Sequence, residues 1–131
     1  MEQPAGNKIT GNPSSHPALS VKWVEDFPDI PLNRNEAYKL RVTSKGVEIE
    51  AITETGVYRA IQTLRQLTEK KGNGIAITGC EITDWPAFRI RGFMQDVGRT
   101  YISTDELKRE IAILARYKIN VFHWHLTENQ A

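Results

Sequence analysis

The chain contains 131 residues, enough for one domain of ordinary size, and its 17 basic and 16 acidic residues give a formal net charge of +1. This balance leaves no excess of positive charge that would favour binding to nucleic acid or to an anionic membrane surface. No apolar run reaches membrane-spanning length. The single cysteine, Cys80, excludes an internal disulfide. With 25% charged and 40% hydrophobic residues, the composition is typical of a globular rather than a disordered chain.

The first part of the chain predicts a loose lead-in over residues 1–18. This stretch is rich in proline, glycine and other turn-forming residues, with one short strand expected near Ile9. Residues 19–23 then alternate apolar with polar side chains, which predicts a strand that ends before the prolines at 28 and 31.

Two further alternating segments, residues 37–42 and 47–52, predict a β-hairpin with one buried and one exposed face. The turn between them ends at Gly46, where a positive φ angle is expected. The hairpin is the strongest short-range pattern in the chain.

From Thr55 onward apolar residues recur at helical spacing, and Lys70 and Lys71 suit the carboxyl end of a helix that Gly72 then stops. A returning extended segment follows around residues 75–82. Residues 19–86 are therefore expected to form a small α+β domain, an antiparallel sheet with a helix packed on one face.

A different pattern begins after Trp85-Pro86. Residues 89–97 predict a strand, Ser103 to Glu106 have the form of a capping box that starts a helix, and residues 119–126 form a nearly continuous apolar strand. This is a βαβ unit. Because two parallel strands alone would leave open edges, the chain is expected to be the front part of something longer.

Arg99 is the first candidate functional residue, because it directly follows a predicted strand. The carboxyl ends of parallel strands are where α/β folds bind ligands, and a guanidinium there can hold neighbouring sugar hydroxyls or a carboxylate. Structural pairing with Asp96 or with Glu128 from the next strand is the alternative. Glu128 could instead orient the arginine or accept a hydrogen bond from a substrate.

His123 and His125 form a second candidate, because residues two apart on a strand point to the same face, with Trp124 on the other. Such a pair could hold a metal ion in a metal-dependent hydrolase, with Glu128 as a further ligand, but a zinc site needs at least three protein ligands. Two hydrogen-bonded histidines inside a barrel are the simpler interpretation.

The residues provide no complete catalytic machinery. The sequence contains no nucleophile elbow, phosphate loop or dinucleotide fingerprint. Its only Asp-Glu dipeptide, Asp105-Glu106, falls in the first turn of a predicted helix, where acidic residues favour the helix dipole. From the residues alone we therefore predict part of a ligand pocket without a complete set of catalytic groups.

Two long motifs carry a family resemblance. Residues 82–99 read ITDWPAFRIRGFMQDVGR, and residues 117–130 read YKINVFHWHLTENQ. These runs resemble the start and the second strand of the catalytic barrel of glycoside hydrolase family 20, the β-N-acetylhexosaminidases. Residues 36–67 are similar to the small α+β domain that precedes that barrel, and the resemblance covers residues 19–131.

The resemblance implies a reaction and roles for particular residues. The family removes terminal N-acetylglucosamine or N-acetylgalactosamine from glycans with retention, using the substrate's acetamido oxygen as nucleophile and an Asp-Glu pair on a later barrel strand. Arg99 matches the arginine that binds the 3- and 4-hydroxyls of the terminal sugar. Glu128 stands where the family commonly has an aspartate that supports the arginine and the sugar. His123 and His125 match a pair that helps to build the barrel interior, so neither a metal nor another cofactor is implied.

Three domain-level expectations follow: a lead-in (residues 1–18), a small α+β domain (residues 19–86), and the truncated start of a TIM (β/α)8 barrel (residues 87–131). A complete barrel needs about 250 residues, so the chain is expected to be the N-terminal part of a hexosaminidase and inactive alone. Its partner in the full-length parent would be a glycan ending in N-acetylhexosamine, with no nucleic acid and no membrane span. A non-catalytic carbohydrate-binding or interaction module is the alternative.

Two further expectations concern the self-association and the cellular location of the protein. Open barrel-strand edges predict self-association of the chain. A periplasmic or secreted parent is expected because relatives are usually exported, although the chain starts with Met1-Glu2-Gln3-Pro4 and shows no signal-peptide pattern.

Overall fold

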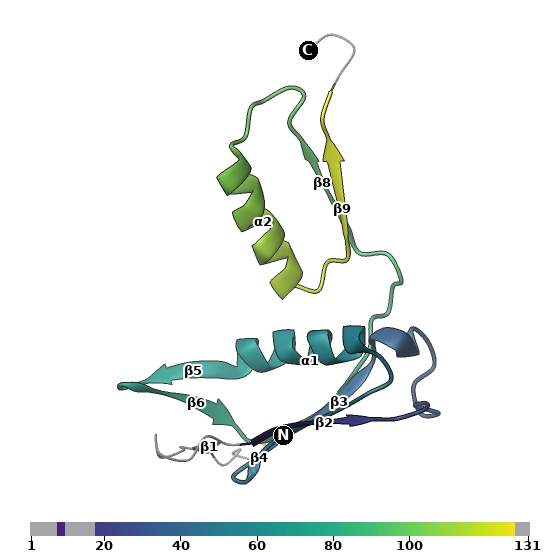
Figure 1. The fold of residues 1–131 in the computed structure, drawn as a ribbon, viewed down its shortest axis with the longest axis vertical. Helices are drawn as coiled ribbons and strands as arrows, with labels where there is room; N and C mark the ends of the chain where they lie inside the picture. Colours follow the sequence, from purple (N-terminus) through teal and green to yellow (C-terminus); the bar gives the residue numbers. More distant parts are fainter. Residues whose placement is uncertain (1–7, 10–17, 128–131) are drawn as a thin grey trace, which may run out of the picture. The chain divides into compact units, whose positions relative to one another are not determined.

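The computed structural model describes residues 8–9 and 18–127. The chain divides into two compact units, Met1–Ala87 and Phe88–Ala131, which are described separately (Figure 1). None of the helices in the described part is long and apolar enough to cross a membrane.

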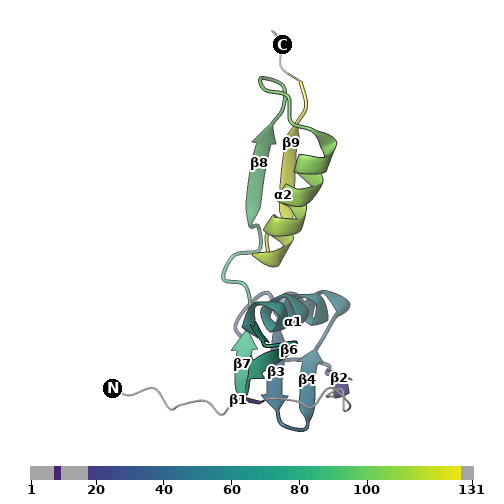
Figure 2. The same cartoon turned by 90° about the vertical axis from the view of Figure 1, so that its left-hand side faces the viewer.

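The first unit is built on a four-stranded sheet with the order β2-β4-β3-β7 (Figure 2). Its strands are β2 (Ala18–Trp23), β3 (Tyr38–Thr43), β4 (Gly46–Ala51) and β7 (Cys80–Asp84). The predicted hairpin is confirmed, because β3 pairs antiparallel with β4, and β7 pairs antiparallel with β3. The edge strand β2 runs parallel to β4, so the sheet is mixed where a purely antiparallel one was expected.

Helix α1 (Glu54–Leu67) covers one face of this sheet. Thr53 caps its start by accepting a hydrogen bond from the Gly56 N–H. Its apolar residues pack on the inward residues of the hairpin, and the resulting core contains Tyr38, Leu40, Val42, Val47, Ile49, Ala51 and Ala60. A short 3-10 helix, η1 (Arg34–Glu36), precedes β3, and the buried Glu36 accepts a 2.8 Å hydrogen bond from Arg59 Nε of α1.

The predicted end of this helix was wrong. Helix α1 ends at Leu67, and the lysines assigned to its last turn lie in β5 (Thr68–Lys71), which pairs with β6 (Gly74–Thr78). The Thr68 hydroxyl donates to the Leu64 carbonyl at 2.9 Å and so satisfies one of the last carbonyls of the helix. Gly72, with φ of 58°, then makes the turn of this second hairpin. Strand β1 (Lys8–Ile9) pairs with β6 and completes a three-stranded sheet.

The second unit is a βαβ unit, as predicted. Strands β8 (Gly92–Asp96) and β9 (Val121–His125) pair in parallel, and α2 (Thr104–Arg116) connects them (Figure 1). Both strands are shorter than expected. Before β8, the Asn120 side chain accepts from the Arg91 N–H and donates to the Arg89 carbonyl, and the Asn120 N–H donates to the Arg91 carbonyl.

Candidate functional site

The candidate site lies at the carboxyl ends of β8 and β9. The parallel register pairs Asp96 with His125, so their side chains point to the same face of the two-stranded sheet. One more backbone hydrogen bond, from the Val97 N–H to the His125 carbonyl at 3.0 Å, continues the pairing past the end of β8. The loop that carries Arg99 therefore leaves the sheet beside His125.

The Asp96 carboxylate is the centre of this arrangement. Its Oδ1 atom accepts a hydrogen bond from the Gly98 N–H at 2.9 Å and lies 3.2 Å from His125 Nδ1. Its Oδ2 atom lies 3.7 Å from Arg99 Nε. One carboxylate thus contacts the backbone of the loop, a ring nitrogen from the neighbouring strand, and the guanidinium of the candidate arginine.

The electrostatics of Asp96 favour its ionised form. Partial burial acts to raise the pKa of this carboxyl, but the hydrogen bond from His125 and the backbone hydrogen bond from Gly98 outweigh it and hold the pKa below its usual value. Asp96 is therefore a carboxylate at neutral pH and acts only as an acceptor there.

Arg99 remains accessible to a ligand while it pairs with Asp96, because its side chain is 72% exposed. The predicted alternative, a pairing with Asp96, is present as a contact of 3.7 Å through Nε. A guanidinium carries five N–H groups in a fixed fork, a geometry that suits neighbouring hydroxyls or a carboxylate. Glu128, the other predicted binding residue, lies outside the described residues.

The two histidines lie on one face as expected, and their ring centroids are 6.5 Å apart. Trp124 lies on the opposite face with Gln95, its partner in the register. Within residues 8–9 and 18–127, no group of three or more histidine, cysteine, aspartate or glutamate side chains is placed to hold a metal ion. His125 uses one ring nitrogen on Asp96.

The Asp105-Glu106 pair serves the helix start, as predicted. Glu106 Oε2 accepts from the Ser103 N–H at 3.1 Å and from the Ser103 hydroxyl at 2.7 Å, and Ser103 accepts in return from the Glu106 N–H. These hydrogen bonds from Ser103 lower the pKa of the Glu106 carboxyl, so this group is a poor general acid.

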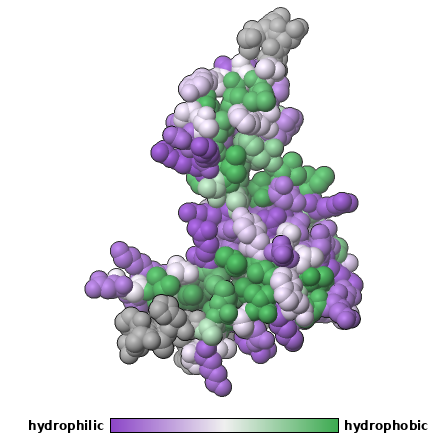
Figure 3. All heavy atoms as spheres, viewed as in Figure 1, coloured by the Kyte–Doolittle hydropathy of each residue, from purple (hydrophilic) through white to green (hydrophobic). Residues whose placement is uncertain are grey.

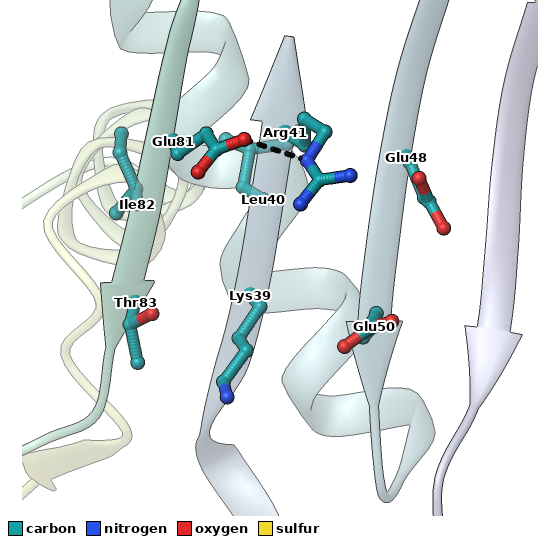
Figure 4. A pocket seen from close by; sticks show the side chains of 8 residues that line it. All are labelled: Lys39, Leu40, Arg41, Glu48, Glu50, Glu81, Ile82 and Thr83. Carbon is teal, nitrogen blue, oxygen red and sulfur yellow. Dashed lines mark ion pairs between the residues drawn. The ribbon is translucent and has the colours of Figure 1, made fainter.

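A separate hollow lies on the first unit, on the face of the four-stranded sheet opposite α1 (Figure 4). It is lined by residues of β3, β4 and β7: Lys39, Leu40, Arg41, Glu48, Glu50, Glu81, Ile82 and Thr83. Its cationic groups are paired, with Arg41 Nε 2.8 Å from Glu81 and Lys39 Nζ 2.9 Å from Asp29. Alternating charges of this kind are typical of the solvent face of a sheet rather than of a ligand site.

The contact between Asp96 and His125 was missed from the sequence. The sequence pattern indicates Asp96 only as a partner of Arg99, and the two histidines only as a metal or barrel pair. The signal that could have found the contact is the register, because an aspartate and a histidine each end one of two adjacent parallel strands.

The chain matches two family models. Residues 4–85 match the model described as glycosyl hydrolase family 20, domain 2, and residues 88–131 match the model described as glycosyl hydrolase family 20, catalytic domain. A β-hexosaminidase of Porphyromonas gingivalis is 42% identical over 99% of this chain and 16% of its own length. A β-N-acetylhexosaminidase of Cellulomonas fimi is 40% identical over 86% of this chain and 23% of its own length.

Solved structures of similarly named enzymes also match this chain. The exo-β-N-acetylglucosaminidase of Vibrio harveyi in complex with N-acetylglucosamine matches with a TM-score of 0.72 and 36% identity, over 86% of this chain and 17% of that one. The β-N-acetylhexosaminidase of Bacteroides fragilis matches with a TM-score of 0.73 and 37% identity, over 84% of this chain and 21% of that one. The chain thus spans less than a quarter of each of these four relatives.

Proposed function

The chain belongs to glycosyl hydrolase family 20, and from this premise we propose that it is the N-terminal part of a β-N-acetylhexosaminidase. The parent enzyme hydrolyses terminal N-acetylglucosamine or N-acetylgalactosamine from glycans by substrate-assisted, retaining catalysis. Residues 19–86 form the domain that precedes the catalytic barrel, and residues 87–131 begin that barrel. The change from one family model to the other between residues 85 and 88 supports this division.

The role of this chain in the reaction is to hold the sugar. Arg99 donates hydrogen bonds to the 3- and 4-hydroxyls of the terminal N-acetylhexosamine, and Glu128 supports the arginine and the sugar. The observation that carries the proposal is the meeting of Asp96, His125 and Arg99 at the carboxyl ends of two adjacent parallel strands. This is the end of a barrel at which ligands bind.

Substitution of Arg99 tests this role. We expect the chain to bind methyl N-acetyl-β-glucosaminide and Arg99→Lys to weaken binding about tenfold, because an ammonium cannot reproduce a two-pronged contact with neighbouring hydroxyls. Isothermal titration calorimetry measures the affinities. Arg109→Lys is the matched control, since Arg109 is an exposed residue of α2 in the same unit. Equal losses in both variants, or none in Arg99→Lys, would refute the role of Arg99.

The chain alone is expected to bind without cleaving. Departure of the aglycone needs a proton from a carboxylic acid, and stabilisation of the charged intermediate needs a carboxylate beside the acetamido group. The only Asp-Glu dipeptide of the chain is engaged in the cap of α2. Purified chain should therefore release 4-nitrophenol from 4-nitrophenyl N-acetyl-β-glucosaminide at the rate of buffer. Release that co-elutes with the protein peak would contradict this expectation and show that the chain holds its own general acid.

A further inference from the structure

Asp96 has more contacts than a simple partner of Arg99 would need. Its two carboxylate oxygens face different groups: Oδ1 faces His125 Nδ1 and the Gly98 N–H, and Oδ2 faces Arg99 Nε. The backbone hydrogen bond to Gly98 fixes the carboxylate relative to the loop, and the register of β8 and β9 fixes it relative to His125. The carboxylate is therefore placed from two sides before any ligand binds.

The contact with His125 determines where the imidazole carries its proton. An ionised carboxylate can only accept, so the short contact to Nδ1 requires that Nδ1 carries the hydrogen. In the neutral ring Nε2 then has a lone pair and is an acceptor. A histidine side chain in water favours the opposite tautomer, with the proton on Nε2. The contact with Asp96 therefore predicts a change in the tautomer of His125 that NMR spectra can detect.

We propose that Asp96 is the positioning residue of this site, fixing His125 as the Nδ1–H tautomer with one carboxylate oxygen and holding the Arg99 guanidinium with the other. Its consequence for ligand binding rests on the proposed sugar-binding role of Arg99. The carboxylate then sets the direction of the guanidinium on one side and the tautomer of the imidazole on the other.

The tautomer of His125 in the wild-type chain provides the first test. Long-range ¹H–¹⁵N spectra of the ¹⁵N-labelled chain, recorded at a pH at which the signals themselves show the neutral ring, distinguish the two tautomers directly. The Nδ1–H form is expected to predominate at His125. His123 lies on the same face and provides an internal comparison. A proton found mainly on Nε2 of His125 would overturn the proposal, and this measurement needs no variant to fold.

Two substitutions separate the functions of the carboxylate. Asp96→Ala removes both contacts, so His125 should lose its preference for Nδ1–H and the Arg99 Nε–H resonance should move toward that of a solvated arginine. Asp96→Asn keeps an oxygen acceptor without the charge, so it should retain the tautomer while the Arg99 resonance still moves. Asp105→Ala is the control, because it removes a carboxylate from the first turn of α2 in the same unit and should change neither signal. An unchanged His125 tautomer in a folded Asp96→Ala chain would refute the proposal.

Sugar binding is measured separately, so that the two proposals fail in different ways. Asp96→Ala should weaken the binding of methyl N-acetyl-β-glucosaminide by about three- to tenfold, the effect of losing one hydrogen bond to a charged group. Equal affinities of the wild type and a folded Asp96→Ala chain would show that Asp96 positions nothing that the sugar uses. If the wild type binds no sugar but His125 and Arg99 respond as expected, the proposed binding role is wrong and the assignment of Asp96 stands.

Discussion

Asp96 shows how a single carboxylate links the two strands of the second unit. Its side chain contacts both the neighbouring strand, through His125, and the following loop, through Gly98 and Arg99. These contacts form with the ionised carboxyl group and weaken when it is protonated. Their contribution to the stability of the folded state therefore depends on pH.

The pH dependence has a definite sign. The pKa of folded Asp96 lies below its ordinary value of 3.8, so its contribution to stability is present above that value and is lost as the pH falls through the lower, folded pKa. Asp96→Asn should therefore lower the urea midpoint of the second unit at pH 7, and the difference from the wild type should shrink below about pH 4. Unfolding followed through NMR signals of β8 and β9 measures it. A difference that is the same at pH 7 and pH 3 would contradict an ionic role.

At the scale of elements, the hairpin of β3 and β4 depends on one glycine. Gly46 has a φ angle of 146°, and a Cβ atom at this position would lie 2.4 Å from the Ala18 carbonyl oxygen of the neighbouring edge strand. A side chain would therefore strain the backbone and also push β2 away from β4.

Gly46→Ala should destabilise the first unit by about 1–3 kcal/mol. Gly74→Ala is the matched control, because a Cβ atom there would have only the Lys71 carbonyl oxygen nearby, at 3.8 Å, and its effect should stay within about 0.5 kcal/mol. Chemical denaturation followed by circular dichroism gives both values. Similar losses in the two variants would show that the close approach to β2 does not limit residue 46.

The elements that could be predicted from sequence are those with local causes. The β3–β4 hairpin and the capping box at Ser103 depend on residues close together in the chain, and both are confirmed. The end of α1 was missed because Lys70 and Lys71 suit a helix terminus, while their actual state depends on pairing with β6. Likewise, Arg99 could be found from its place after a strand, but the Asp96–His125 contact follows from a parallel register that joins distant parts of the chain.

At the scale of the molecule, apolar side chains remain at the surface of both units (Figure 3). In the described part of the second unit, β8 and β9 form a two-stranded sheet, and exposed residues include Met94, Trp124 and Leu126. A two-stranded parallel sheet with exposed apolar groups and unpaired edges is a template for association.

The chain is therefore expected to self-associate through the second unit. Sedimentation velocity at increasing protein concentration should show the weight-average mass rising above that of a 14.9 kDa monomer. Trp124→Lys, which places a charge on this sheet, should shift the distribution toward monomer, while Tyr58→Lys, at an exposed site on α1 of the first unit, should not. A monomer that persists over the whole concentration range would show that the open edges do not pair.

The proposed binding of a terminal N-acetylhexosamine at the carboxyl ends of β8 and β9 can be tested by chemical-shift mapping of the ¹⁵N-labelled chain with methyl N-acetyl-β-glucosaminide, because the shifts report where the sugar binds. Saturable shifts centred on Asp96, Arg99 and His125 are predicted. Shifts that instead cluster on the charged hollow around Lys39 and Arg41 would contradict the claim and favour a carbohydrate-binding role for the first unit.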